Sequence, residues 1–404
     1  MKRIIFVNRY FPPDHSATSQ LLGDLAFHLV ERGREVSVVT SRQRYDEPRA
    51  SLPATEIIAG VRVHRVAATR FGRSQSFGRG LDYLSFWAAV GRAVLAVSRP
   101  GDILVAKTDP PLLCVAAMRA ARRQGLTLVN WLQDLYPEVG ARLGVPFLSG
   151  PLGAGLMRLR DAALHEAVAN IAVSDRMAQK LCARSVTADR VHVIPNWCDD
   201  EAIQPLAWHD NPLRREWGLE DRFVVGYSGN LGRAHEFETL LVAAERLRHD
   251  PRIVFLFIGG GRIEQLRHRI AERGLEQQFR FVPYQDRDAL KYSLTLPDLH
   301  WLSLLPEVEG LIFPSKLYGI AAAGRPFVAV AARDGEIADL SRRYECGIVI
   351  EPGDAAGLAA LLTRLSEDSE SLAAMGNRAR RMLDENFTRY HAFQRWRAVL
   401  DSIG

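Results

Sequence analysis

Two sets of short apolar runs, separated by one segment without periodicity, are the feature that most constrains the fold of this chain. Residues 3–8, 102–106 and 126–131 in the first half, and 222–229 in the second, are apolar almost throughout. Strands that are buried on both faces of a parallel sheet have this pattern. Stretches with helical spacing, such as 20–33, lie between most of the runs. This alternation predicts an α/β fold with doubly wound parallel sheets.

The interruption divides the chain into two similar halves. Residues 196–212 are polar, contain proline and show no periodicity, and the alternation restarts after them. We therefore predict a Rossmann-like N-terminal domain over residues 1–200 and a second Rossmann-like domain over residues 201–386. Two such domains would face a cleft, with ligands at the carboxyl ends of the strands. The amphipathic last helix, residues 387–404, is expected to pack back on the first domain.

Cysteine and hydropathy patterns restrict the compartment. The four cysteines are far apart, with no CxxC pair, which argues against structural zinc and a disulfide framework and suits a reducing cytoplasm. The longest apolar runs fall short of the roughly 18 residues needed to span a bilayer, and the N-terminus does not have the pattern of a signal peptide. We expect a cytoplasmic protein.

The charge is unevenly shared between the halves. Residues 1–200 contain 26 Lys and Arg against 18 Asp and Glu, whereas residues 201–404 contain 26 against 29. The excess is either chance surface composition or a sign of an acidic partner, such as anionic lipid or a phosphorylated acceptor. No nucleic-acid motif accompanies the charge, so we expect no nucleic-acid partner.

One stretch of the first half, residues 70–87, combines basic and aromatic side chains. This composition suits peripheral contact with the anionic inner face of a membrane. The alternative is a loop followed by a helix whose aromatic residues belong to the core. The residues concerned are Arg70, Phe71, Arg73, Phe77, Arg79, Tyr83, Phe86 and Trp87.

The loops after the first-half strands offer candidate acceptor-binding residues. Residues 8–20 end in small side chains at a predicted helix start, where free backbone N–H groups can bind oxygen ligands. Residues 132–140 place two carboxylates after a strand, where they could orient hydroxyl groups or act as bases. Both sets could equally be loop and capping residues. The candidates are His15, Ser16, Thr18, Asp134 and Glu138.

Three loops of the second half are suited to an anion. The turns at 227–240 and 257–262 are rich in glycine, and the segment "EGLIFPSKLYGIAAAGRP" (309–326) places Lys316 in the first turn of a predicted helix. A cation there opposes the helix dipole, which an anionic ligand would explain. Free N–H groups and a guanidinium would suit a pyrophosphate. The candidates are Gly229, Asn230, Gly232, Arg233, Pro314, Ser315, Lys316 and Leu317.

The whole chain resembles the family 4 retaining glycosyltransferases, which have the GT-B fold, and in particular a bacterial subgroup of O-antigen and colanic-acid assembly that includes fucosamine-type transferases. The matching stretches are "GDLAFHLVERGREVSVVT", "AVSDRMAQKL", "VIPNWCD", "GYSGNLGR" and "PSKLYGIAAAGRPFVAV".

The resemblance implies that the second domain binds a nucleotide sugar and the first an acceptor. It places the diphosphate at the Gly229–Arg233 turn and at Ser315–Lys316, and the base near Tyr284. Asp134 matches the acidic member of a His-Asp pair in the acceptor-binding cleft. The catalytic candidates are Asp134, Lys316, Arg233 and Glu309.

The sequence also departs from the family pattern. The second Glu of the family's Glu-x7-Glu motif, which contacts the ribose, falls at Gly319, and the first falls at Leu311. Glu309 would replace one of them only if the loop is rearranged. Gln133 stands where the family has His. There is no DxD motif, so we expect no metal and no cofactor.

The expected activity is retaining transfer from a nucleotide sugar, with UDP as the expected nucleotide, to a lipid-linked or glycan acceptor of surface polysaccharide, lipopolysaccharide or glycolipid synthesis. Two alternatives remain open. A sugar-nucleotide-binding scaffold would bind donor without turnover, and a GT-B epimerase would convert a UDP-sugar without acceptor.

Overall fold

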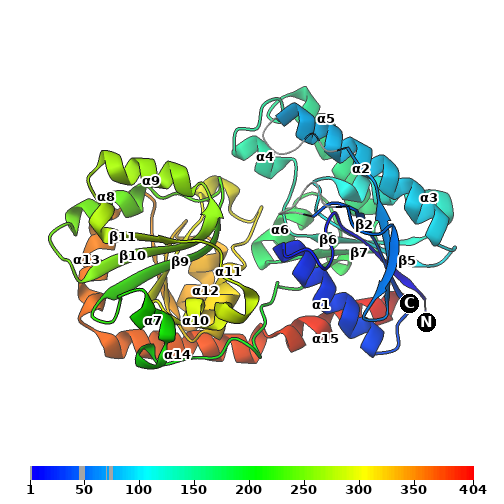
Figure 1. Cartoon of the computed structure of the whole chain (residues 1–404). Coiled ribbons are helices and arrows are strands. Elements are labelled where there is room, and N and C mark those ends of the chain that lie inside the picture. Colours follow the sequence, from blue (N-terminus) through cyan, green and yellow to red (C-terminus); the bar gives the residue numbers. More distant parts are fainter. Residues whose placement is uncertain (1, 45–50, 70, 72–75) are drawn as a thin grey trace. The chain divides into compact units, whose positions relative to one another are not determined.

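The computed structural model describes residues 2–44, 51–69, 71 and 76–404, without the side chains of Ser76, Phe77 and Arg79. The chain divides into two compact units (Figure 1). Unit 1 contains residues 1–195 and 393–404, and unit 2 contains residues 196–392. These boundaries lie within six residues of the predicted ones.

Unit 1 is built on an eight-stranded sheet in the order β3-β4-β2-β1-β5-β6-β7-β8. All neighbouring strands are parallel except β3 and β4, which form an antiparallel edge pair. The four-residue β3, with partly exposed side chains, was not predicted from the sequence. The strands are β1 (Ile4–Val7), β2 (Val36–Ser41), β3 (Thr55–Ile58), β4 (Val61–Val66), β5 (Ile103–Lys107), β6 (Thr127–Leu132), β7 (Ala169–Ala172) and β8 (Val191–Val193).

Helices cover both faces of this sheet, as the buried strands require. Figure 1 shows α2, α3 and α5 on one face and α1 and α15 on the other. Within α15, Trp396 packs edge-on against Trp131 of β6, with 4.8 Å between ring centroids, and Asp401 pairs with Arg34 at 2.8 Å. The helices are α1 (Ala17–Glu31), α2 (Ser76–Val97), α3 (Leu113–Gln124), α4 (Glu138–Arg142), α5 (Pro151–Glu166), α6 (Asp175–Cys182) and α15 (Arg389–Ile403).

Unit 2 has an all-parallel sheet in the order β11-β10-β9-β12-β13-β14. Its central strands are apolar runs buried on both faces, as predicted, and their side chains form the core. The strands are β9 (Phe223–Leu231), β10 (Ile253–Gly261), β11 (Phe279–Val282), β12 (Leu299–Ser303), β13 (Phe327–Val330) and β14 (Gly347–Ile350).

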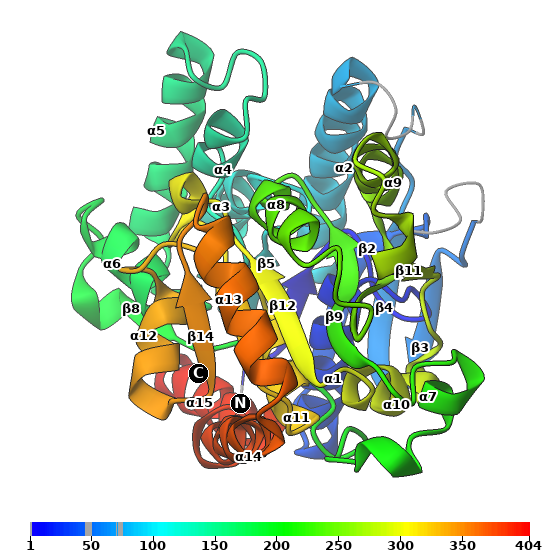
Figure 2. The ribbon, with the colours of Figure 1, turned by 90° about the vertical axis from the view of Figure 1, so that its left-hand side faces the viewer.

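The helices of unit 2 flank this sheet (Figure 2). Helices α8 and α13 contact each other on one face, and α11 packs against α14 and α10 on the other. The strand order reverses between β9 and β12, and loops at the carboxyl ends beside such a reversal commonly bind ligands. The helices are α7 (Pro212–Glu216), α8 (Glu238–Arg246), α9 (Ile263–Glu272), α10 (Leu290–Thr295), α11 (Lys316–Ala322), α12 (Glu336–Tyr344), α13 (Ala355–Ser366) and α14 (Ser369–Asn386).

Candidate active site

Glycine residues form a side-chain-free floor at the carboxyl ends of β9 and β10. Gly229 and Gly259 are register partners, with φ of +125° and +131°, a region that L side chains rarely adopt. A Cβ atom on Gly259 would lie 2.3 Å from the carbonyl oxygen of Gly229. The close approach of the two backbones therefore requires glycine at both positions. Because neither residue has a side chain, the peptide groups at this point are left uncovered.

Lys316 extends across this floor from the start of α11. A Cβ atom on Gly229 would lie 2.6 Å from Cε of Lys316, and the ammonium nitrogen lies 5.2 Å from the ring centroid of Tyr227. Among the described residues, none accepts a hydrogen bond from this ammonium or forms an ion pair with it. Burial lowers the pKa of Lys316 from 10.5 to about 8. A half-buried cation over uncovered backbone is well suited to an anionic ligand.

A hydrogen-bonded pair supports the floor from below. The Tyr227 hydroxyl donates to the carbonyl of Asn230 at 2.7 Å, which fixes the turn after β9. Nδ1 of His235 donates to the carbonyl of Ser303 at 2.7 Å, and Nε2 lies 3.3 Å from the Tyr227 hydroxyl. Burial, and then the charge of Lys316, lower the pKa of His235 to about 4, so the imidazole is neutral at pH 7. Neither Tyr227 nor His235 was among the site residues predicted from the sequence.

Tyr284 lies at the edge of the same floor. A Cβ atom on Gly260 would be 2.9 Å from its ring, so the aromatic side chain rests against a glycine backbone. The side chain is 61% exposed. An exposed aromatic ring can stack on a nucleobase, so the role that the resemblance implies for Tyr284 stays a prediction.

The other predicted donor residues are arranged differently. Asn230 is exposed near the end of β9, and Arg233 is exposed in the turn that follows, directly after Gly232. Ser315 precedes α11 without a capping hydrogen bond from its side chain. Pro314 and Leu317 are buried, and Leu317 is only 1% exposed, so its side chain belongs to the core.

Glu309 is used by a neighbouring helix. Its Oε1 accepts a hydrogen bond from the backbone N–H of Glu336 at the start of α12, at 2.8 Å. A carboxylate at a helix N-terminus is favourable there, which gives this side chain a structural role. Gly319 is buried within α11, and a Cβ atom on it would already contact Leu294 at 3.4 Å.

Two of the predicted acceptor residues, Thr18 and Asp134, lie near the carboxyl ends of β5 and β6. Thr18 donates from its hydroxyl to Asp109 at 3.3 Å, and the backbone N–H of Gln133 donates to the Thr108 hydroxyl at 2.8 Å. Asp134 follows directly, half-buried. Burial, and then the neighbouring charge of Asp109, raise the pKa of Asp134 to about 6. Among the described residues, none donates a hydrogen bond to its carboxylate.

Two predicted acceptor residues have local structural contacts. The Glu138 carboxylate pairs with Arg160 at 2.5 Å and with Arg184 at 2.9 Å, which ties α4 to α5. The backbone N–H of Ser16 donates to Asp14 at 2.8 Å. His15 is exposed in the loop before α1.

Lys107 was not predicted and lies beneath this cluster. Its ammonium donates to the carbonyl of Thr18 at 3.1 Å and sits 3.8 Å from the ring centroid of Trp131. Burial lowers its pKa well below the ordinary value. In the sequence, Lys107 is the polar residue that ends an apolar strand, and no neighbouring residue indicates that its side chain is buried.

The stretch at 70–87 has a mixed outcome. Arg70 and Arg73 lie outside the described residues, as do the side chains of Phe77 and Arg79. Phe86 is fully buried, Trp87 packs against the core, and Tyr83 lies under the guanidinium of Arg9, with 5.4 Å to the ring centroid. Phe86 and Trp87 follow the core alternative, whereas Tyr83 is half-buried and Phe71 is 60% exposed. Membrane contact stays a prediction.

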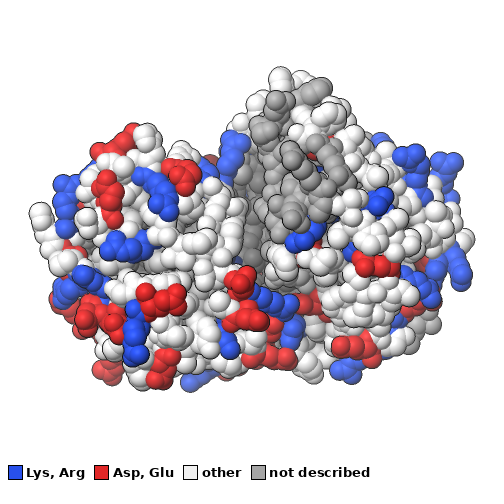
Figure 3. Space-filling model, viewed as in Figure 1, with Lys and Arg blue, Asp and Glu red and all other residues white. Residues whose placement is uncertain are grey.

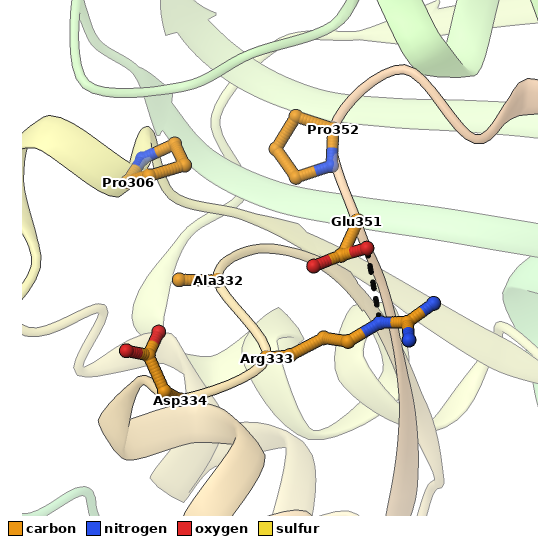
Figure 4. A pocket seen from close by; sticks show the side chains of 6 residues that line it. All are labelled: Pro306, Ala332, Arg333, Asp334, Glu351 and Pro352. Carbon is orange, nitrogen blue, oxygen red and sulfur yellow. Dashed lines mark ion pairs between the residues drawn. The ribbon is translucent and has the colours of Figure 1, made fainter.

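A separate pocket of about 570 Å³ opens at the carboxyl ends of β12–β14 (Figure 4). Arg333 and Glu351 form an ion pair across it at 3.1 Å. None of the predicted donor residues lines it. The lining residues are Pro306, Ala332, Arg333, Asp334, Glu351 and Pro352. Within the described ranges, no three His, Cys, Asp or Glu side chains are grouped so that they could hold a metal ion.

Gly229→Ala should displace Lys316 from the floor. The new methyl group would lie 2.6 Å from Cε of Lys316, too close for both to stay, and the positive φ adds about 1–3 kcal/mol of backbone strain. We expect the Kd for a nucleoside diphosphate, measured by calorimetry, to rise about tenfold or more. Gly353→Ala is the matched control, because Gly353 has a φ of +93° but no atom within 4 Å of the Cβ that alanine would add. Equal binding by both variants would contradict the described position of Lys316.

Comparison with known proteins assigns both halves of the chain to glycosyltransferase families. Residues 18–197 match the family model described as "Glycosyl transferase 4-like domain", and residues 210–382 match "Glycosyl transferases group 1". WcaI of Escherichia coli K12, a glycosyl transferase assigned to colanic acid biosynthesis, is 27% identical over 378 residues, which cover 89% of this chain and 91% of WcaI. WbjE of Pseudomonas aeruginosa, assigned as a glycosyltransferase, is 25% identical over 82% of each chain.

Solved structures agree with the fold. HepE of Anabaena in complex with UDP-glucose superimposes over both complete chains with a TM-score of 0.75 at 18% identity. WaaG, a glycosyltransferase of lipopolysaccharide biosynthesis, superimposes with a TM-score of 0.68 at 14% identity, over 98% of this chain and 99% of WaaG. The fold and the two family models together define a glycosyltransferase of the GT-B class. The chain belongs to glycosyltransferase family 4.

Proposed function

We propose that this enzyme transfers a sugar from a nucleoside diphosphate sugar, with retention of configuration, to a lipid-linked or glycan acceptor in the synthesis of a bacterial surface polysaccharide or glycolipid. The observation that carries the proposal is the half-buried Lys316 ammonium over the glycine floor of β9 and β10. The polysaccharide context is supported by the similarity to WcaI and WbjE.

In this proposal the two units contribute different groups to the reaction. Lys316 and Arg233 stabilise the negative charge of the departing diphosphate, and Tyr284 stacks on the base. Asp134 holds the acceptor hydroxyl. The diphosphate itself accepts the proton of that hydroxyl on the same face of the sugar, so no enzymic nucleophile is required. Such preorganised charge stabilisation supplies roughly 3–4 kcal/mol per donor in well-studied sites.

UDP is the nucleotide that we favour, because HepE binds UDP-glucose in the same fold. A mannosyltransferase of Mycolicibacterium smegmatis, 28% identical over 65% of this chain, is GDP-mannose-dependent, so GDP-sugars are the main competitor. We place the enzyme in the cytoplasm, which suits its four free cysteines.

A thermal-shift screen over nucleoside diphosphates tests the donor class. A ligand present at 100 times its Kd should stabilise the fold by about 2.7 kcal/mol, which is readily visible as a higher Tm. We expect this shift with UDP, a smaller one with GDP, and no change on adding EDTA. A shift that EDTA abolishes would contradict metal-independent diphosphate binding, and no shift with any nucleoside diphosphate would contradict the donor site. Product analysis by NMR then decides between retention and inversion.

A further inference from the structure

Lys107, at the end of β5, is a cation in the core of unit 1. Figure 3 shows lysine and arginine side chains on the surface of both units, whereas Lys107 is only 1% exposed. Its ammonium donates to the carbonyl of Thr18 at 3.1 Å and lies 3.8 Å from the ring centroid of Trp131, its register partner on β6. A buried charge is costly, and a methionine would fill similar space without that cost. Packing alone therefore does not explain a lysine here.

The lysine joins the end of β5 to the start of α1. Thr18, the second residue of α1, accepts the hydrogen bond from Lys107 through its carbonyl, and its hydroxyl donates to the Asp109 carboxylate at 3.3 Å. One threonine thus links the buried cation to a carboxylate at the carboxyl edge of the sheet. Burial lowers the pKa of Lys107 well below 10.5, and the charges of Asp109 and of Asp24 in α1 act in the opposite direction.

Beyond Lys107, the segments that follow β5 and β6 meet at two further positions. The backbone N–H of Gln133 donates to the Thr108 hydroxyl at 2.8 Å, which holds the two strand ends together. One residue further along each segment stand Asp109 and Asp134, both half-buried. Burial, and then the charge of Asp109, raise the pKa of Asp134, so the two carboxylates are near enough to repel each other. The contacts of β5 with β6 therefore end in a pair of like charges.

We propose that Lys107 is a positioning residue, which holds Asp109 and Asp134 side by side as a pair of ionised carboxylates for the acceptor. The ammonium fixes the start of α1 and the end of β6, and its positive charge opposes the repulsion within the pair. Because ionised carboxylates only accept hydrogen bonds, the pair takes two neighbouring hydroxyl groups of a neutral sugar and disfavours an acidic one. The inference rests on the proposed function in one respect, the contact of Asp134 with the acceptor, and it adds Asp109 as a second contact.

The charged groups around Lys107 and the pair, among the described residues, are carboxylates. Helix α1 contributes Asp24, the segment after β5 contributes Asp109, and the segment after β6 contributes Asp134. Strand β6 and helix α15 contribute aromatic rings, which carry no charge. Removing the positive charge of Lys107 should therefore make the pair harder to ionise, and removing one carboxylate of the pair should make the other easier to ionise.

An NMR titration of the full chain, labelled with carbon-13 at the aspartate carboxyl groups, tests the inference without any substrate. Asp134→Asn identifies the signal of Asp134, whose midpoint we expect near pH 6 in the wild type. Lys107→Met should raise this midpoint by about one pH unit, because a neighbouring positive charge is lost. Asp109→Asn should lower it, because a neighbouring negative charge is lost. A merely structural role for Lys107 would not produce these opposite shifts.

Lys180→Met is the matched control, because Lys180 is an exposed lysine of α6 in the same unit, and it should leave the midpoint unchanged. The Tm of Lys107→Met should equal or exceed that of the wild type, since a buried charge is replaced by an apolar side chain. If this variant does not fold, Lys107→Gln and the shift in Asp109→Asn carry the test. An unchanged midpoint in either folded Lys107 variant, or in Asp109→Asn, overturns the inference.

Kinetics with octyl glycosides of neutral sugars as acceptors measure the contact with substrate. Asp109→Asn should raise KM for the acceptor about tenfold, because one hydrogen-bonded contact is lost, and leave KM for the nucleotide sugar unchanged. Lys107→Met should lose about fivefold in kcat/KM at pH 6 and recover to within about twofold at pH 8.5, where the pair is ionised again. An unchanged acceptor KM in Asp109→Asn contradicts the second contact. Failure of the proposed function is distinct: the wild type then transfers no sugar, and the titration still reports on the pair.

Discussion

Lys316→Ala should lower kcat/KM for the nucleotide sugar about tenfold at least, and about 10²-fold if the ammonium acts mainly on the departing diphosphate. The side chain contributes a cation that the described protein leaves without an ion-pair partner, directly over the glycine floor. A nucleoside diphosphate should therefore lose most of its stabilising effect on the variant. Lys291→Ala is the matched control, because that lysine also lies over a tyrosine ring, at 4.9 Å from the Tyr292 centroid, but is exposed elsewhere in unit 2.

The effect of pH gives a second readout for Lys316. Its folded-state pKa of about 8 lies below the ordinary 10.5, so the ligand-free fold carries an unfavourable cation below pH 8 and is relieved of it as the pH rises toward 10.5. The variant should hence be as stable as the wild type or more stable at pH 7, with the difference vanishing near pH 10.5. Because a diphosphate favours the charged form, wild-type affinity should fall as the pH rises through about 8. Near-normal kcat/KM in the variant would exclude a role for Lys316 in diphosphate binding.

Asp134→Asn should reduce transfer about 10²-fold or more while making the fold more stable at neutral pH. Because the pKa of Asp134 is raised in the folded state, its ionised carboxylate lowers the free energy of unfolding above pH 6. This destabilisation disappears below pH 3.8, where the group is protonated in both states. The difference between these values corresponds to roughly 3 kcal/mol as an upper bound. The free energy of unfolding of the asparagine variant should exceed that of the wild type by part of this amount at pH 7.5, and by nothing near pH 3.5.

Tm and kcat measured on the same preparations test this pair of opposite effects. Wild-type kcat should also fall as the pH drops through about 6, because protonation removes the carboxylate that we propose for the acceptor hydroxyl. Glu31→Gln, at an exposed carboxylate of the same unit that forms no ion pair within the described residues, provides the control and should leave both quantities nearly unchanged. Loss of both stability and activity in Asp134→Asn would indicate a structural carboxylate.

The fold was predictable because its strands are buried on both faces and so appear as apolar runs. The run 126–131 corresponds to β6 within one residue, and the run 102–106 corresponds to β5 within one residue. The edge strand β3 escaped prediction because its side chains alternate between exposed and half-buried positions and include Glu56. Apolar content therefore locates the buried strands of such a sheet and misses its edges.

The site was only partly predictable, because its electrostatics depend on contacts between distant segments. A lysine at a helix start could be noticed from the sequence, and the structure places Lys316 against Gly229. The attachment of Glu309 to α12 spans 27 residues, and the pairing of Glu138 with Arg160 spans 22, so neither had a local signal. The burial of Lys107 beneath the acceptor residues is likewise a property of the fold alone.

The discontinuous composition of unit 1 has a consequence for biosynthesis. Residues 196–392 form unit 2 as one uninterrupted segment, whereas unit 1 lacks Trp396 and its contact with Trp131 until residues 393–404 arrive. On the ribosome, unit 1 is therefore the first unit to be synthesised and the last to be completed. The surface of β6 that Trp396 covers stays uncovered while unit 2 is synthesised, and a chaperone that shields apolar surface would be most useful during that interval.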